Sequence, residues 1–102
     1  MSEQSEITGP LVKMLRQMGI FTLRLNSGKV RVRGGYMHLC PEGTADILCW
    51  PKGRTCWLET KALKGVMRDK QMEFRDTVTA LGHEYYEIRS LDAGLDAVRE
   101  GV

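Results

Sequence analysis

Residues 46–61 read Asp-Ile-Leu-Cys-Trp-Pro-Lys-Gly-Arg-Thr-Cys-Trp-Leu-Glu-Thr-Lys, which is two apolar strand patterns separated by turn residues. A turn over residues 51–54 folds this stretch into an antiparallel hairpin that pairs Asp46 with Glu59. Since side chains alternate across a strand, both carboxylates point to one face with Cβ atoms roughly 5 Å apart. Lys61 lies two residues beyond Glu59 and shares that face. The stretch therefore predicts a hairpin that carries two acids and a lysine at its open end.

Two carboxylates that face each other repel unless a cation lies between them. A hard divalent ion such as Mg²⁺ is held by paired carboxylates, with phosphate oxygens and waters completing its shell. A lysine beside such an ion can hold a water or help to deprotonate it for attack on a phosphoryl group. Asp46, Glu59 and Lys61 thus suit phosphodiester hydrolysis. The alternative is that residues 59–61 are an ordinary exposed strand end and residues 43–46 a simple turn.

The remaining sequence predicts helices and strands on both sides of this hairpin. Apolar residues at helical spacing predict a first helix that ends at Gly19 and begins either near Thr8, with Pro10 in its first turn, or near Ser5 with a kink. Ser90 is the expected N-cap of the last helix. The other expected elements are strands over 20–25, 30–33, 36–39 and 84–88, and helices over 66–81 and 91–98. This order predicts an α/β protein with a mixed sheet flanked by helices.

Length and composition restrict the class of protein further. The chain has 102 residues, which is the size of a single domain, and its 15 Lys and Arg against 13 Asp and Glu give a net charge of +2. No apolar run approaches the roughly 20 residues of a membrane span, and no cationic leader precedes an apolar stretch at the start. Three cysteines are too few for a disulfide framework. We therefore expect a cytoplasmic protein with no membrane partner.

Charge is unevenly distributed along the chain. The stretch from Phe21 to Cys40 contains no acid. Its basic and histidine residues are Arg24, Lys29, Arg31, Arg33 and His38. Such a one-sign stretch is either a strip that faces phosphates or a solvated hairpin.

The segments Gly43-Thr44-Ala45-Asp46-Ile47 and Glu59-Thr60-Lys61, followed by Gln71 on the next helix, resemble the motifs of the PD-(D/E)XK nuclease superfamily. Within it, the chain is most similar to the virus-type replication-repair nuclease (VRR-NUC) domain, and Arg24-Leu25-Asn26-Ser27-Gly28 adds to the likeness. The resemblance implies a restriction-endonuclease-like α-β-β-β-α-β core in one nuclease domain over residues 1–102. Ala45 departs from the family, which often has proline at this position.

The resemblance also implies a role for each motif residue. Asp46, Glu59 and the carbonyl of Thr60 would be ligands of Mg²⁺, for which Mn²⁺ would substitute. Lys61 would orient or activate the attacking water, and Gln71 would lie near the water or the phosphate. An acid on the first helix would reach the metal directly or through water. Glu6 fits this last position better than Glu3.

The resemblance finally implies the partners. Standalone VRR-NUC proteins of phages resemble Holliday-junction resolvases, so branched DNA, a homodimer and the cytoplasm of a bacterial host are expected. The expected DNA contacts are Arg24, Asn26, Ser27, Lys29, Arg31, Arg33, Lys64 and Arg68. Two alternatives stay open: a DNA-binding module without catalysis, whose affinity would fall steeply with salt, and a restriction-type nuclease, which would cut plasmid DNA into discrete bands.

Overall fold

The computed structural model describes residues 3–25 and 29–100, and the side chains of residues 7–25, 30–37 and 39–99. The elements run in the order α1 (Glu3–Gln17), β1 (Thr22–Arg24), β2 (Lys29–Val32), β3 (Gly35–His38), β4 (Ile47–Cys49), a 3₁₀ turn (Pro51–Gly53), β5 (Cys56–Thr60), α2 (Asp69–Ala80), β6 (Glu84–Ile88) and α3 (Leu91–Glu100). This is the order that the sequence predicts.

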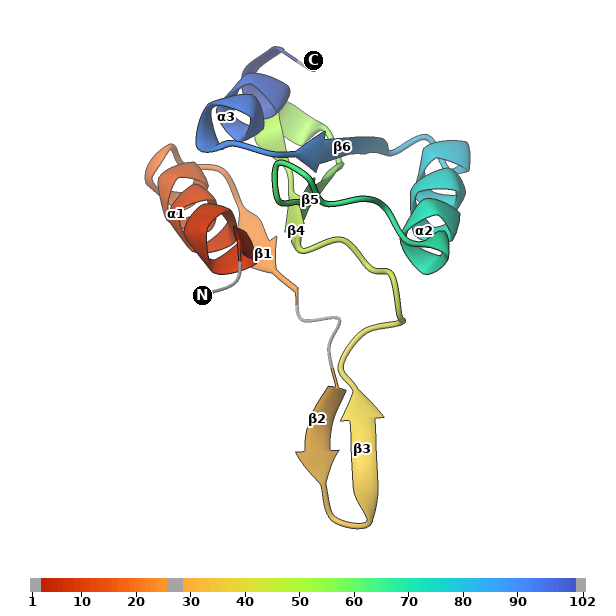
Figure 1. Ribbon diagram of the computed structural model, residues 1–102. Helices are drawn as coiled ribbons and strands as arrows, with labels where there is room; N and C mark the ends of the chain where they lie inside the picture. Colours follow the sequence, from red (N-terminus) through yellow and green to blue (C-terminus); the bar gives the residue numbers. More distant parts are fainter. Residues whose placement is uncertain (1–2, 26–28, 101–102) are drawn as a thin grey trace.

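The strands form two sheets. The main sheet has the order β1-β4-β5-β6, in which β5 and β6 are parallel and the other neighbours are antiparallel. Strands β2 and β3 pair with each other in a separate hairpin that projects from the body (Figure 1). The prediction of an α/β protein with a mixed sheet flanked by helices is confirmed.

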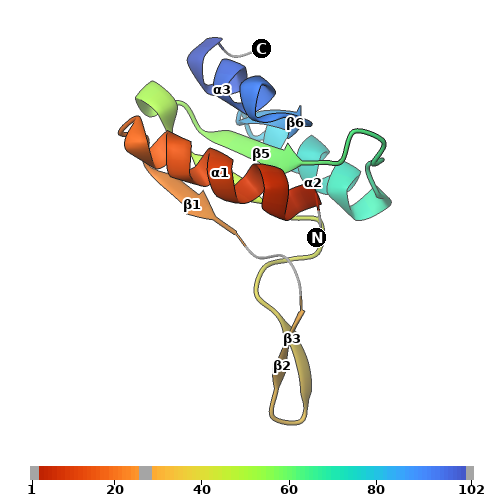
Figure 2. The same ribbon diagram turned by 60° about the vertical axis from the view of Figure 1, so that its left-hand side comes forward.

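Helices cover both faces of the main sheet. On one face α1 lies along the strands beside α3 (Figure 2), and Leu11, Leu15, Ile47 and Leu58 are fully buried between these layers. Helix α2 packs on the other face. There the rings of Trp57 on β5 and Phe74 on α2 contact each other edge to face, with 4.9 Å between the ring centroids.

The register of β4 and β5 agrees with the register predicted from the turn. Cys49 lies opposite Cys56, and Leu48 lies opposite Trp57. The turn between the strands needs left-handed backbone, since Lys52 has a φ of 51°. Because this turn fixes the register, it also determines which side chains meet at the other end of the hairpin.

Helix α1 begins earlier than both predicted starts. It starts at Glu3 and continues through Pro10, so a start near Thr8 is wrong and a start near Ser5 is closer. Proline inside a helix removes one backbone hydrogen bond. Burial of Leu11 and Leu15 on the sheet outweighs that loss, while Pro10 itself lies in solvent.

The last helix has the predicted cap, because the Ala93 N–H donates a 3.1 Å hydrogen bond to Oγ of Ser90. In the part of the chain that the structure describes, no helix is long and apolar enough to cross a bilayer.

Candidate functional site

The candidate site lies at the open end of the β4–β5 hairpin. Asp46 immediately precedes β4, and Glu59 and Thr60 end β5. All three are buried, and only 1% of the Glu59 surface is exposed. An ordinary exposed strand end would be solvated, whereas Glu59 and Thr60 are not.

Asp46 is fixed to the neighbouring strand by Thr60. Its Oδ2 accepts hydrogen bonds from the backbone N–H of Thr60 at 3.0 Å and from the Thr60 hydroxyl at 2.8 Å. The Thr60 Oγ1 also lies 2.6 Å from Oγ1 of Thr8 on α1. A chain of hydrogen bonds therefore connects α1 to β5 and to Asp46, and orients this carboxylate.

A second chain of hydrogen bonds connects Glu59 to Lys61 through Gln71 of α2. The Gln71 Nε2 donates to Oε2 of Glu59 at 3.3 Å, while its Oε1 accepts from Nζ of Lys61 at 2.7 Å. The same Oε1 accepts from the backbone N–H of Arg68 at 2.9 Å, at the start of α2. Because both ends of the amide are used, Gln71 holds the acid and the lysine in a fixed relation.

Close packing of two backbones places α2 beside Asp46. Gly43 has a φ of +89°, and a Cβ at this position would lie 2.2 Å from the carbonyl oxygen of Lys70. Only glycine fits such a contact without a shift of the backbone. The loop before Asp46 is thereby held against the first turn of α2, which carries Gln71.

The Glu59 carboxyl group is in an unfavourable environment for a charge. Its Oε1 is buried and accepts no hydrogen bond from the described residues. Burial first, and the nearby Asp46 carboxylate second, raise the pKa of Glu59 to about 8, although Lys61 opposes the shift. Glu59 is therefore largely protonated at neutral pH in the metal-free protein.

The residues present fit a hard divalent cation. Two adjacent carboxylates, one of them with a buried oxygen that lacks a donor, supply the oxygen ligands that Mg²⁺ prefers. Within the described side chains, no group of three or more Asp, Glu, His or Cys residues gathers at one place. The expected third acid, Glu6, lies in α1, but its side chain is outside the described residues, as is that of Glu3. The role of the Thr60 carbonyl stays a prediction.

The expected DNA-contacting residues occupy three separate places. Arg24 is exposed on β1, Arg31 and Arg33 are exposed on the projecting hairpin, and Lys64 and Arg68 are exposed before α2. Asn26 and Ser27 lie outside the described residues, and the side chains of Lys29 and His38 are not described either. The hairpin itself is confirmed, whereas its contact with phosphates stays a prediction.

Sequence reasoning missed the two buried hydroxyls of the site. The sequence indicates Thr8 only as a possible helix start, and the resemblance implies a role only for the carbonyl of Thr60. Both threonines are almost fully buried and hydrogen-bonded to each other. A threonine on the apolar face of the predicted first helix was the one available signal, because a buried hydroxyl needs a partner.

A mixed sheet covered on both faces by helices, with two buried acids and a lysine at the open end of its central hairpin, defines a nuclease-type α/β fold. The chain is similar over its whole length to a solved structure described as a "VRR_NUC domain", with a TM-score of 0.73, 12% sequence identity and 100% of each chain covered. The protein thus has the fold of a VRR-NUC domain. No model of a protein family matches the sequence, and no curated protein does.

Proposed function

We propose that this chain is a single nuclease domain that hydrolyses phosphodiester bonds in DNA with the help of Mg²⁺. The observation that carries the proposal is the buried pair Asp46 and Glu59, linked through Gln71 to the ammonium group of Lys61. Burial of two neighbouring acids without a cation costs stability. A site that holds a metal and acts on phosphates explains why these residues lie together.

Asp46 and Glu59 would hold the metal, which when bound supplies Lewis-acid stabilisation of charge on the phosphoryl oxygens. Lys61 would hold the attacking water beside the phosphate and stabilise the negative charge that develops on it. Gln71 would position Lys61 and Glu59, since its amide already bonds to both. Thr60 would keep Asp46 in the orientation that binding requires.

The finer parts of the proposal are branched DNA as substrate and a homodimer as the active form. The projecting β2–β3 hairpin, with its exposed Arg31 and Arg33, supports contact with DNA outside the active site (Figure 1). Two sites related by two-fold symmetry would match the two strands that must be cut in a four-way junction.

The test is cleavage of labelled four-way junctions and linear duplexes by the wild type and Asp46→Asn, with Mg²⁺, with Mn²⁺ and with EDTA. We expect metal-dependent cleavage by the wild type and none by Asp46→Asn, which keeps the shape of the side chain but removes one charge from the metal site. DNA binding by the variant should be unchanged or tighter. Glu73→Gln, an exposed acid on α2, is the matched control and should cleave normally.

Three results would contradict the proposal or part of it. If the wild type cuts no DNA with any divalent metal, the nuclease proposal is wrong, and DNA binding without cleavage would favour the non-catalytic module. Normal cleavage by Asp46→Asn would overturn the site assignment. Equal cutting of linear duplexes and junctions would overturn branched DNA as the preferred substrate.

A further inference from the structure

A basic groove lies between α1 and β1, on the side of the protein opposite α2. It has a volume of about 460 Å³ and is open to solvent. Its lining residues are Gly9, Val12, Lys13, Arg16, Gln17 and Arg24. Half of these residues are cationic and none is acidic, so the charged residues that line the groove are all positive. The sequence alone does not mark Lys13, Arg16 or Gln17 as residues of a site.

Arg16 is held in place before any ligand arrives. Its Nε and Nη2 donate to the carbonyl oxygen of Thr22, at 3.3 and 3.1 Å. Its Nη1 donates to none of the described residues and is left to a ligand. Because the guanidinium is already oriented, binding an anion here immobilises little additional side chain.

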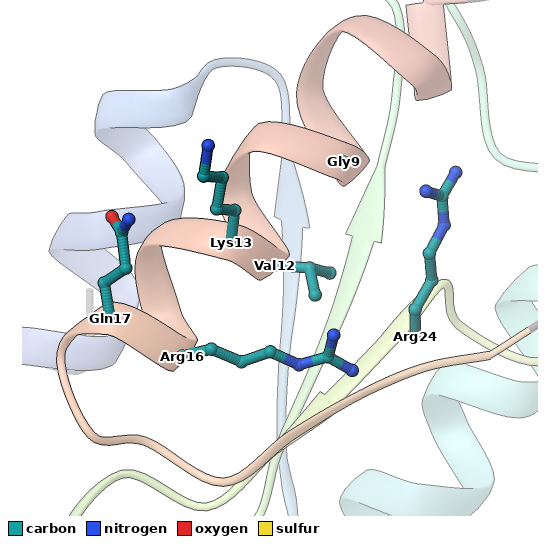
Figure 3. Close-up of a pocket in the computed structure, with 6 residues that line it drawn as sticks. All are labelled: Gly9, Val12, Lys13, Arg16, Gln17 and Arg24. Atoms are coloured by element: carbon teal, nitrogen blue, oxygen red, sulfur yellow. The ribbon is translucent and has the colours of Figure 1, made fainter.

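Arg24 lines the groove from the β1 side. Figure 3 shows Arg16 reaching from α1 toward β1 and Arg24 reaching back toward Gly9, with Val12 beside them. Nη1 of Arg24 lies beside Gly9, since a Cβ built at this position would be in ordinary van der Waals contact with it, at 3.8 Å. The two guanidinium groups thus line the groove from different elements.

Two residues that line the groove are chain neighbours of residues that are hydrogen-bonded to the candidate active site. Gly9 follows Thr8, whose hydroxyl bonds to Thr60. Arg24 precedes Leu25, whose N–H donates to the carbonyl oxygen of Asp46 at 2.7 Å. A ligand in the groove would therefore continue toward the two carboxylates.

The length of the groove fits a nucleic-acid backbone. From Gly9 to Gln17 the helix rises about 12 Å, at 1.5 Å per residue. Successive phosphates of one DNA strand are at least about 3.4 Å apart, which is their rise along the duplex axis, so this length takes at most about three or four phosphates. A row of fixed and flexible cations on that scale is suited to a chain of phosphates rather than to a single small anion.

We propose that the groove between α1 and β1 binds the phosphate backbone of one DNA strand and leads that strand to the Asp46–Glu59 site. This inference rests on the proposed function for its substrate. It adds a second DNA-contacting surface on the main body, apart from the projecting hairpin.

The experiment measures DNA binding in EDTA, so that cleavage plays no part in it. Fluorescence anisotropy of a labelled duplex and a labelled four-way junction gives Kd for each variant between about 50 and 200 mM salt. Lys13→Gln removes one exposed charge from the groove. Lys52→Asn is the matched control, because it removes one charge from the turn between β4 and β5, away from the groove. Asparagine also tolerates the left-handed backbone at this position.

We expect Lys13→Gln to lower the slope of log K against log salt by about 0.9, and affinity about fivefold to tenfold at 0.1 M salt. Lys52→Asn should match the wild type. Gln17→Glu, which removes no cation and adds a negative charge, should also weaken binding. Circular dichroism of each variant verifies that the helices are intact.

An unchanged slope for Lys13→Gln would overturn the groove as a DNA site, as would an equal loss in Lys52→Asn, since net charge alone would then explain the effect. Absence of any DNA binding by the wild type would overturn it as well. Binding with the expected slopes, but no cleavage with any metal, would support the groove while the nuclease proposal fails.

Discussion

Because the carboxyl group of Glu59 is buried, we expect the free energy of unfolding of the metal-free protein to fall as pH rises. Its pKa is raised from 4.5 to about 8 in the folded protein, whereas the unfolded chain has the ordinary value. The folded state therefore binds the proton more tightly, and stability is fully present below about pH 4.5 and is lost as pH rises through about 8. At 1.36 kcal/mol per pKa unit, the complete loss is about 5 kcal/mol.

Glu59→Gln removes this titration with little change of shape. Its carbonyl oxygen can still accept from Gln71, and its amide can donate toward Asp46. In EDTA we expect the variant and the wild type to have similar free energies of unfolding near pH 4. At about pH 9 the variant should be more stable by several kcal/mol. Urea unfolding, followed by circular dichroism across this pH range, measures the difference.

Glu73→Gln is the control, because the same chemical change at an exposed position should alter stability by less than about 0.5 kcal/mol at any pH. Saturating Mg²⁺ should reduce the gap between Glu59→Gln and the wild type, since the cation stabilises only the ionised acid. A wild type whose stability is the same at pH 5 and pH 9 would refute the reasoning, as would a Glu59→Gln protein that is no more stable at high pH.

Three further predictions test the site and its framework. Lys61→Ala should slow single-turnover cleavage by about 10²–10⁴-fold while Mg²⁺ and DNA affinities stay near wild type, and unchanged rates would make Lys61 a surface residue. Gly43→Ala should lower the free energy of unfolding by more than about 2 kcal/mol in urea, because its Cβ would collide with the backbone of Lys70; a neutral effect would contradict the close contact. Arg54 holds the pKa of Glu84 at about 2. Glu84→Gln should therefore be less stable than wild type at neutral pH and equally stable below about pH 2, which thermal melts at a series of pH values would measure. A stability difference that does not change with pH would argue against the ion pair.

The sequence predicts most of the fold, because hairpin registers depend on local turn residues. The turn after Trp50 fixes the pairing of β4 and β5, and this pairing brings Asp46 and Glu59 together without knowledge of any other element. Helix spacing likewise identifies the face of α2 that carries Gln71. The start of α1 was less predictable, since the cost of Pro10 is outweighed by tertiary burial that a local pattern does not contain.

Other parts of the site depend on contacts between distant segments. The hydrogen bond between Thr8 and Thr60 joins residues 52 positions apart, and no local pattern pairs the two hydroxyls. Arg54 donates to the carbonyl oxygens of Ala97 and Val98 at the end of α3, although its sequence context indicates only a turn. The groove beside α1 also needs Arg24 from another element, so the basic face of the helix alone does not reveal it.

The place of the acids on one hairpin has a consequence for the order of folding. Asp46 and Glu59 lie at the open end of one hairpin whose strands are joined by a short turn, and hairpins form within about 1–10 μs. Lys61 and Gln71 are 10 residues apart, and their contact also needs the first turn of α2, which carries Gln71, to form beside the sheet. A nascent chain contains residues 46–61 before Gln71 is synthesised, so its hairpin alone can bring the two negative charges together. Its early hairpin would be favoured whenever one of the two acids holds a proton.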